Sequence, residues 1–278
     1  MSPRDKLEVV GRTDPGRVRS HNEDSIGENI DLGVVVLADG MGGYKGGEVA
    51  SAIAVNTILQ ELQDRLPGAD PGGTDKSTGY SQGSIIAREA IIRANEAIHQ
   101  ASQSQPQYQG MGTTVALAIF YDSRVSLAHV GDSRIYRFRE QRLSQVTVDH
   151  TLLQELVDRG FYTAQEAKES LNKNLVTRAL GIEQTVAVDI QEELALPGDI
   201  YLLCSDGLND MLDDPEICLT IKRFSANLEK AAEELIRLAN EKGGKDNVSV
   251  ILARPHGSEP TRPGWLGTIS SWFSKKSA

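Results

Sequence analysis

The chain has 278 residues, of which 39% are hydrophobic, so it is long enough to bury a sizeable core in one or two domains. Its 29 Lys and Arg against 39 Asp and Glu give a net charge of −10. Such an acidic balance argues against nucleic-acid binding, because phosphate contacts require Lys and Arg. The two cysteines, Cys204 and Cys218, lie in no CxxC motif, so neither a zinc site nor a redox site is predicted.

No apolar run has the length of a signal peptide or of the roughly 20 residues that span a bilayer, which predicts a cytoplasmic protein. We also find no internal repeat and no shift in composition before residue 254. We therefore expect one domain over residues 1–254, followed by a linker and tail over residues 255–278.

Hydrophobic periodicity predicts the secondary structure. In chain order we predict a strand at 32–38, helices at 47–66 and 84–101, strands at 112–121, 125–130 and 135–138, a short polar helix near 151–171, strands at 185–194 and 199–204, helices at 214–224 and 227–242, and a strand at 248–253. Several strands follow one another with only turns between them, which favours antiparallel pairing. The predicted fold class is α+β, with a central β-sandwich of two antiparallel sheets flanked by pairs of helices.

Four aspartates stand at the ends of strongly apolar predicted strands: Asp39, Asp132, Asp206 and Asp246. Each taken alone is more typical of a turn, since Asp-Gly is a common turn dipeptide. Neighbouring strands bring their ends together, however, so four such carboxylates are expected to converge. An all-oxygen set of ligands suits Mg²⁺ or Mn²⁺ rather than zinc.

The segment RSHNED adds a second signal, because Arg19 precedes the acidic pair Glu23 and Asp24. The arginine fork is the natural bidentate partner of a phosphate dianion. In an extended segment the two acidic side chains point to opposite faces, one toward a metal and the other toward a structural hydrogen bond. The alternative for this segment alone is a polar surface turn.

Together these segments resemble the PPM family of metal-dependent protein phosphatases, also called the PP2C type. The matching pieces, in the family's order, are RSHNED, ADGMGG, MGTTV, VGDSR, DHTL, LVTRALG, CSDGL and GGKDNVSV. Each piece is weak alone, but the ordered set is specific and extends from Arg19 to Val250. DGMGG is similar to the bacterial branch.

The resemblance implies a metal site at one end of the sandwich, formed by Asp39, Gly40, Asp206, Asp246, Glu23, Asp24 and Asp132. Asp39 would bridge two ions, one of them also bound by the Gly40 carbonyl, and Asp206 and Asp246 would complete their ligands. Glu23 and Asp24 would hold metal-bound waters, and Asp132 would contribute with Asp206 to a third, weaker ion.

The resemblance also implies that Arg19 binds the phosphate and that residues 152–177 form a flap that helps to choose substrates. One position departs from the animal members, which carry a histidine as the proposed general acid in DGHGG. Here that position is Met41, which has no proton to donate, so the leaving group would take its proton from a metal-bound water or from His21.

The implied function is hydrolysis of phosphoserine and phosphothreonine in proteins by direct attack of a metal-bridging hydroxide, opposing a bacterial Ser/Thr kinase. The expected cofactors are two Mn²⁺ or Mg²⁺ ions, with phosphorylated proteins as partners and no nucleic acid. The alternatives are a phosphoprotein-binding pseudophosphatase and a dedicated phosphatase of one regulatory switch protein. A two-metal phosphodiesterase or nuclease is disfavoured by the acidic charge and the lack of a basic, aromatic groove.

The tail has an amphipathic pattern, with apolar residues on one helical face and two lysines after them. The apolar residues are Trp265, Leu266, Ile269, Trp272 and Phe273. This pattern predicts contact with a membrane interface or with a partner, which would make the cytoplasmic protein peripherally membrane-associated. Packing against its own domain and a disordered tail are equally compatible with the pattern.

Overall fold

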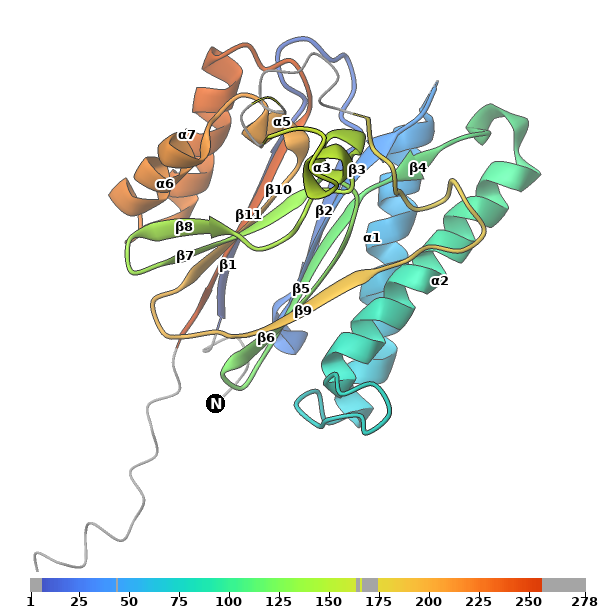
Figure 1. Ribbon diagram of the computed structural model, residues 1–278, viewed down its shortest axis with the longest axis horizontal. Helices are drawn as coiled ribbons and strands as arrows, with labels where there is room; N and C mark the ends of the chain where they lie inside the picture. Colours follow the sequence, from blue (N-terminus) through green and yellow to red (C-terminus); the bar gives the residue numbers. More distant parts are fainter. Residues whose placement is uncertain (1–6, 44, 164–165, 167–174, 257–278) are drawn as a thin grey trace, which may run out of the picture.

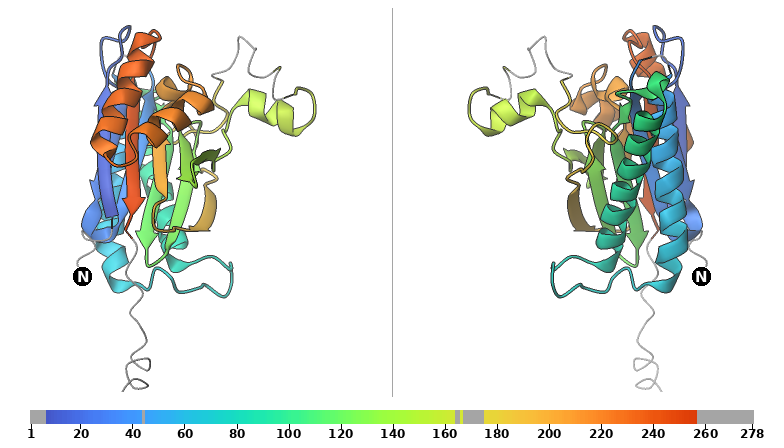
Figure 2. Two further views of the ribbon diagram at one scale, coloured as in Figure 1. Left: turned by 90° about the vertical axis from the view of Figure 1, so that its left-hand side faces the viewer. Right: turned by 90° about the vertical axis from the view of Figure 1, so that its right-hand side faces the viewer.

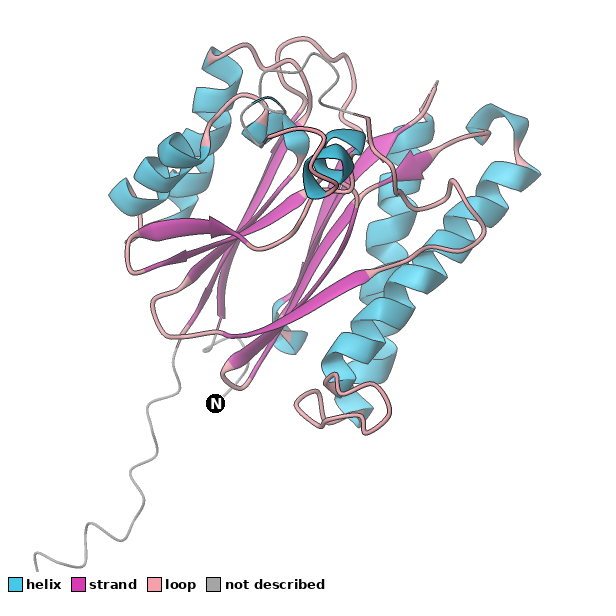
Figure 3. Cartoon of the chain, in the orientation of Figure 1, coloured by secondary structure: helices cyan, strands magenta, loops and turns pink. Residues whose placement is uncertain are grey.

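The computed structural model describes residues 7–43, 45–163, 166 and 175–256. Two antiparallel sheets pack face to face, and a pair of helices covers the outer face of each sheet (Figures 1 and 3). The predicted α+β class, with its αββα layers, is therefore confirmed.

The strands are β1 (Leu7–Asp14), β2 (Asp24–Asn29), β3 (Val34–Met41), β4 (Gly112–Thr113), β5 (Val115–Tyr121), β6 (Arg124–Val130), β7 (Arg134–Arg139), β8 (Arg142–Gln145), β9 (Asp189–Leu194), β10 (Ile200–Cys204) and β11 (Val248–Pro255). The α-helices are α1 (Gly46–Arg65), α2 (Gln82–Ser104), α3 (Leu152–Asp158), α5 (Asp206–Asn209), α6 (Asp214–Arg223) and α7 (Leu228–Glu241). Short 3-10 turns lie at Ile30–Leu32, Leu66–Gly68 and Pro106–Tyr108.

One sheet has the strand order β1-β11-β10-β7-β8, and the other has the order β2-β3-β5-β6-β9, with β4 added to the end of β3. Every described pairing is antiparallel. Hairpin neighbours such as β5 and β6 account for the short connections in the sequence, as expected for antiparallel strands.

Strand β3 shows why the sandwich buries continuous apolar runs. Val34 and Val36 belong to the apolar cluster shared with α1 and α2, whereas Val35 and Leu37 belong to the cluster between the two sheets. All four side chains are fully buried because successive residues of a strand point to opposite faces and both faces are covered. A third cluster joins the first sheet to α5, α6 and α7.

The second helix pair begins as its sequence predicts. Asp213 caps α6 in a capping box with Glu216, and Pro215 lies in the first turn of the helix, where its missing N–H removes no hydrogen bond. Asn227 caps α7 by accepting a hydrogen bond from the backbone N–H of Lys230. These caps satisfy backbone N–H groups at the starts of α6 and α7, and the apolar cluster packs both helices against the first sheet.

Three strands were absent from our predictions, namely β1, β2 and the short β8. β1 and β2 carry charged residues and glycines and lie at the edges of their sheets, where only one neighbour is needed and a continuous apolar run is not required. The strand predicted from residue 185 begins at Asp189 instead. These differences leave the order of the layers unchanged.

The helix predicted near 151–171 is α3, which ends at Asp158, and most residues beyond 163 in that stretch lie outside the described part. The tail residues from Trp265 to Phe273 also lie outside it, so contact of the tail with a membrane or a partner stays a prediction. In the described part of the chain, no helix combines the length and the apolarity needed to span a bilayer.

Candidate active site

The predicted acidic residues are brought to one edge of the sandwich, which we call the acidic edge. Asp24 begins β2 and pairs directly with Asp39 near the end of β3, while Asp206 begins α5 just after β10. Asp246 lies two residues before β11, and Asp132 lies in the turn between β6 and β7. The negative charges of all four neighbours act on Asp39. The structure therefore gathers carboxylates that lie up to 222 residues apart in the sequence.

Burial and mutual repulsion govern the ionisation of these carboxylates. Burial and the charges of the neighbouring aspartates raise the pKa of Asp39 and of Asp206 well above the ordinary value. Burial also raises the pKa of Asp24 and of Asp132 to about 6 in each case. Bringing so much negative charge together is unfavourable without a cation, and this is the electrostatic pattern of a metal site.

Asp24 shows directly that the residues fit a cation. Its Oδ2 atom accepts hydrogen bonds from Ser205 Oγ at 2.8 Å and from Ser249 Oγ at 2.6 Å. Its Oδ1 atom is buried and has no hydrogen-bond donor among the described residues. A buried carboxylate oxygen that lacks a donor is suited to a metal ion or to a metal-bound water. We expected one of Glu23 and Asp24 to make the structural hydrogen bond and the other to face a metal, whereas Asp24 alone has one oxygen in structural hydrogen bonds and one without a donor among the described residues.

The backbone at the end of β3 is fixed by a close approach to α1. A Cβ atom at Gly40 would lie 2.1 Å from the carbonyl oxygen of Gly47 and 2.6 Å from that of Glu23, so only glycine fits. The Gly40 N–H donates to the Glu23 carbonyl at 3.1 Å. Glycine at this position therefore holds Glu23, Asp39 and the start of α1 together.

Two threonines fix the backbone of Asp39, and the sequence had shown them only as part of a motif. Asp39 N donates to Thr114 Oγ1 at 3.0 Å, and Thr113 Oγ1 donates to the Asp39 carbonyl at 2.8 Å. Both threonines are buried. They hold the main chain, so the Asp39 carboxylate is left to face the other acidic residues.

Arg19 lies at the rim of the acidic group. Its Nη2 atom donates to Asp246 Oδ2 at 2.7 Å, and about half of its side chain is exposed. This position leaves part of the guanidinium fork facing solvent, where a phosphate could approach it. Arg19 is thus placed next to a predicted metal ligand, as a phosphate-binding arginine requires.

Asn247 supports the site and was missed by the sequence reasoning. Its Nδ2 atom donates to the carbonyls of Pro15 at 3.0 Å and His21 at 2.8 Å, and its Oδ1 atom accepts from Glu23 N at 2.8 Å. One buried amide thereby anchors the loop that carries Arg19 beside Asp246. The only signal in the sequence was the Asp-Asn pair in GGKDNVSV, of which we singled out the aspartate alone.

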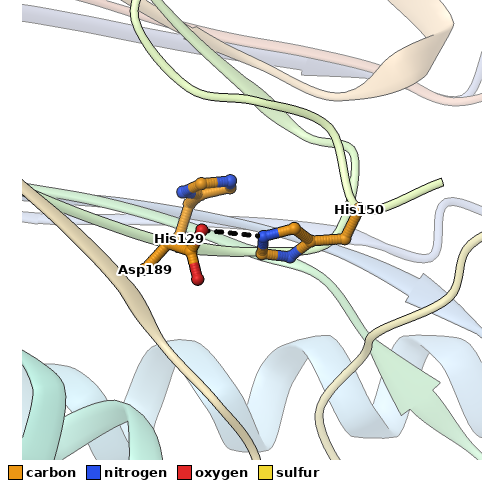
Figure 4. A group of neighbouring side chains, drawn as sticks. All are labelled: His129, His150 and Asp189. Atoms are coloured by element: carbon orange, nitrogen blue, oxygen red, sulfur yellow. Dashed lines mark ion pairs between the residues drawn. The ribbon is translucent and has the colours of Figure 1, made fainter. Parts of the chain in front are cut away.

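A second group of polar side chains lies near the base of the predicted flap. His129, His150 and Asp189 have potential ligand atoms within 4.8 Å of one another (Figure 4). The acidic residues are spaced more widely, since no three of them within the described ranges meet this distance. The acidic edge is thus recognised by its excess charge and by the Asp24 oxygen, not by a closed ring of ligands.

The base of the predicted flap lies beside Gly131, the residue before Asp132. Helix α3 projects away from the two sheets (Figure 2). Phe161, just after this helix, is 72% exposed, and Leu152 and Tyr162 are also exposed. This segment exposes apolar and aromatic groups, and its base is tied to Gly131 by the hydrogen bond from His150 N.

Comparisons with known proteins agree with this geometry. The family model described as "Protein phosphatase 2C" matches residues 17–252. The serine/threonine phosphatase stp of Listeria monocytogenes is 37% identical over 244 residues, which are 87% of this chain and 93% of that protein. The serine/threonine protein phosphatase PstP of Mycobacterium tuberculosis is 39% identical over 250 residues, which are 89% of this chain but only 45% of that protein.

Solved structures are similar as well. A crystal structure of M. tuberculosis PstP has a TM-score of 0.80 at 37% identity and covers 90% of this chain and 99% of that one. A structure of the PstP catalytic domain in complex with two manganese ions has a TM-score of 0.76 over the same shares. The chain therefore belongs to the protein phosphatase 2C family. The predicted enzyme class, a protein serine/threonine phosphatase, is confirmed at the level of that family.

Proposed function

We propose that this chain hydrolyses phosphoserine and phosphothreonine esters in proteins at the acidic edge, and that residues 1–254 form the catalytic domain. The proposed ligands of two Mn²⁺ or Mg²⁺ ions are Asp39, Gly40, Asp206 and Asp246, with Glu23 and Asp24 on metal-bound waters and Asp132 on a third, weaker ion. The observation that carries this proposal is the convergence of repelling carboxylates around a buried oxygen that lacks a donor. The two manganese ions in the related PstP structure support it.

A pair of hard cations bound by these residues would polarise the phosphoryl oxygens and lower the pKa of a bound water toward neutrality. The chain would hold these ions with its carboxylates, of which Asp39 has its backbone fixed by Thr113 and Thr114 and Glu23 has its N–H bound by Asn247. Arg19, held by Asp246, orients the phosphate and offsets the charge that its oxygens carry in the transition state.

The nucleophile in this proposal is water, and Cys204 does not compete for the role. Cys204 is fully buried, and burial raises the pKa of its thiol to about 12. Such a thiol is not ionised near neutral pH and is inert as a nucleophile. The direct attack of water thus needs no covalent enzyme intermediate.

We further propose that the partners are proteins phosphorylated by a Ser/Thr kinase. The exposed Phe161 and Tyr162 of the predicted flap support this choice, since apolar contacts around a phosphorylated residue favour a peptide over a small ester. A phosphatase dedicated to one switch protein is the narrower form of the same proposal.

The proposal predicts the outcome of one substitution most clearly. Asp39→Asn removes a charge from the centre of the acidic group and should reduce Mn²⁺-dependent hydrolysis of a phosphoserine peptide at least about a thousand-fold. Hydrolysis is measured as released phosphate, with phosphothreonine and phosphotyrosine peptides, a cyclic nucleotide and DNA assayed alongside. Circular dichroism checks that the fold is kept.

Asp75→Asn is the matched control, because it makes the same chemical change at an exposed turn in the loop before α2. This variant should keep the activity of the unsubstituted chain. Activity retained in Asp39→Asn would refute the assigned site. No hydrolysis by the unsubstituted chain, together with binding of the phosphopeptide, would identify a pseudophosphatase, and preferred cleavage of DNA or a cyclic nucleotide would identify a phosphodiesterase.

A further inference from the structure

The imidazole of His150 is held on both of its nitrogens. Nδ1 accepts a hydrogen bond from the backbone N–H of Gly131 at 3.0 Å, and Nε2 lies 3.3 Å from Asp189 Oδ2 (Figure 4). The ring stacks on His129 with a centroid distance of 4.6 Å, and both histidines are buried. Arg178 Nη1 donates to Asp189 Oδ1 at 2.7 Å and so neutralises that carboxylate.

These contacts fix the tautomer of His150 and argue against a metal at this group. A backbone amide can only donate, so Nδ1 must be the acceptor and Nε2 must carry the ring hydrogen. A neutral imidazole in that form has no lone pair left for a metal, because its one acceptor nitrogen already serves Gly131. Arg178 Nη1 also lies 3.0 Å from Nε2, but a guanidinium can only donate, so it cannot accept the ring hydrogen. Among the described residues, Asp189 is the partner of the ring that can accept it, and Arg178 also donates to Asp189 and to the Ala187 carbonyl.

The backbone of His150 lies where the flap begins and ends. Its carbonyl accepts from Thr177 N at 2.8 Å, and the next residue, Thr151, forms a β-bridge with Val176. Its own N–H donates to the Gly131 carbonyl at 2.9 Å. His150 therefore makes two hydrogen bonds to Gly131 and one to the segment that leaves the flap.

Gly131 in turn lies against the groups that fix the acidic edge. It has a φ of 104°, and a Cβ atom there would lie 2.6 Å from the side chain of Thr114. Thr114 Oγ1 holds the backbone of Asp39 and also contacts Ser133 Oγ at 2.7 Å. Asp132 follows Gly131 directly, so a shift of Gly131 would move this carboxylate relative to Asp39.

We propose that His150 is a positioning residue. Its hydrogen bonds to Gly131 fix the position of the Asp132 carboxylate, and its backbone connects this turn to both ends of the flap. Asp189 and Arg178 keep its ring in the required tautomer and orientation. The inference rests on the proposed function, since it assumes that Asp132 contributes to an ion. A movement at the base of the flap would then shift Asp132 through His150 and Gly131, without any flap residue entering the metal site.

Two substitutions separate the two ring contacts. His150→Asn places an amide oxygen near the position of Nδ1 and keeps the acceptor for Gly131, whereas His150→Gln places its amide near Nε2 and keeps only the contact with Asp189. His129→Asn is the matched control, since it removes the stacked ring and the contact with the Val148 carbonyl but no bond to Gly131. Circular dichroism confirms that each variant folds.

The test measures Mn²⁺ binding by the electron paramagnetic resonance of free Mn²⁺, with phosphopeptide hydrolysis as a second readout. We expect His150→Gln to weaken the weakest Mn²⁺ site about tenfold or more, and His150→Asn and His129→Asn to change it less than about threefold. An equal loss in the Asn and Gln variants of His150, or in His129→Asn, would show that the histidine pair is merely packed there.

The two proposals fail in different ways. If the unsubstituted chain binds no Mn²⁺ and hydrolyses no phosphopeptide, the proposed function itself is wrong. If the unsubstituted chain binds Mn²⁺ and is active but His150→Gln binds Mn²⁺ with unchanged affinity at every site, only the role of His150 is overturned.

Discussion

The acidic edge and the cluster of His129, His150, Asp189 and Arg178 are neighbouring groups of titratable side chains with opposite electrostatic character. In the cluster, hydrogen bonds from Arg178 and His150 outweigh burial and lower the pKa of Asp189. Burial and the neighbouring His129 and Arg178 lower the pKa of His150 to about 4, so its ring is neutral near pH 7. At the acidic edge the pKa of Asp39 is raised, as is that of Asp206.

The difference shows how a structural cluster is distinguished from a metal site when both contain ligand-type residues. In the cluster the one carboxylate is offset by an arginine, and the acceptor nitrogen of His150 is used. At the acidic edge the carboxylates repel one another, and Asp24 Oδ1 has no donor in the described part of the chain. Negative charge that the protein leaves uncompensated is therefore a better indicator of a metal site than ligand atoms that merely lie close together.

The largest expected effect is on the stability of the metal-free protein as a function of pH. Asp24 and Asp132 have a pKa of about 6 in the fold against 3.8 in the unfolded chain, so between these values the folded state holds protons that the unfolded state has released. The free energy of unfolding should therefore fall as pH rises through this window, by up to about 1.4 kcal/mol per pH unit for each group. Denaturant titration measures this slope.

Added Mn²⁺ should remove this fall, because it stabilises the ionised carboxylates. Carboxylates with a lowered pKa, such as Asp189, contribute a slope of the opposite sign, so the decisive quantity is the difference between curves with and without Mn²⁺. Asp206→Asn should flatten the metal-free curve, while Asp189→Asn should not. Equal curves with and without the metal would contradict the account of the acidic edge.

A smaller effect is expected when the arginine of each group, Arg19 or Arg178, is substituted. Arg19→Ala should raise the KM of a phosphopeptide about tenfold, and more than that of p-nitrophenyl phosphate, because the fork that orients the phosphate is lost. Arg178→Ala should lower the free energy of unfolding by about 1 kcal/mol with a smaller change in KM, since its contacts lie within the His150 cluster. Steady-state kinetics and denaturant titration measure both.

Arg19→Lys separates the contribution of the positive charge from that of the guanidinium fork. It keeps the positive charge beside Asp246 but loses the bidentate fork, so it should recover only part of the affinity for phosphate. If Arg19→Ala changed the KM of peptide and small ester equally, Arg19 would be a structural partner of Asp246.

The layers of the fold and the convergence of the acidic residues could be predicted from the sequence, because both have strong local signals. Buried strands such as β3 are continuous apolar runs; Asp39 directly follows one such run, and Asp206 lies two residues after another. The edge strands β1 and β2 carried no such run, since each needs only one neighbour.

The support of the site could not be predicted, because its residues act through contacts that only the fold creates. Asn247 holds three backbone groups that lie more than 220 residues away in the sequence. His150 was visible only as part of DHTL, and nothing in the sequence shows that its ring meets Gly131 and Asp189. Thr114 likewise lies between β4 and β5 with no distinguishing local signal and gains its role from its contact with Asp39.

The most direct test of the central claim is a crystal structure of the protein grown with Mn²⁺, with the ions located by their anomalous scattering. We predict manganese at the acidic edge, with Asp39 shared between two ions and with Asp206 and Asp246 among their ligands. Manganese bound by His129, His150 and Asp189, or an acidic edge whose aspartates share no ion, would contradict the account.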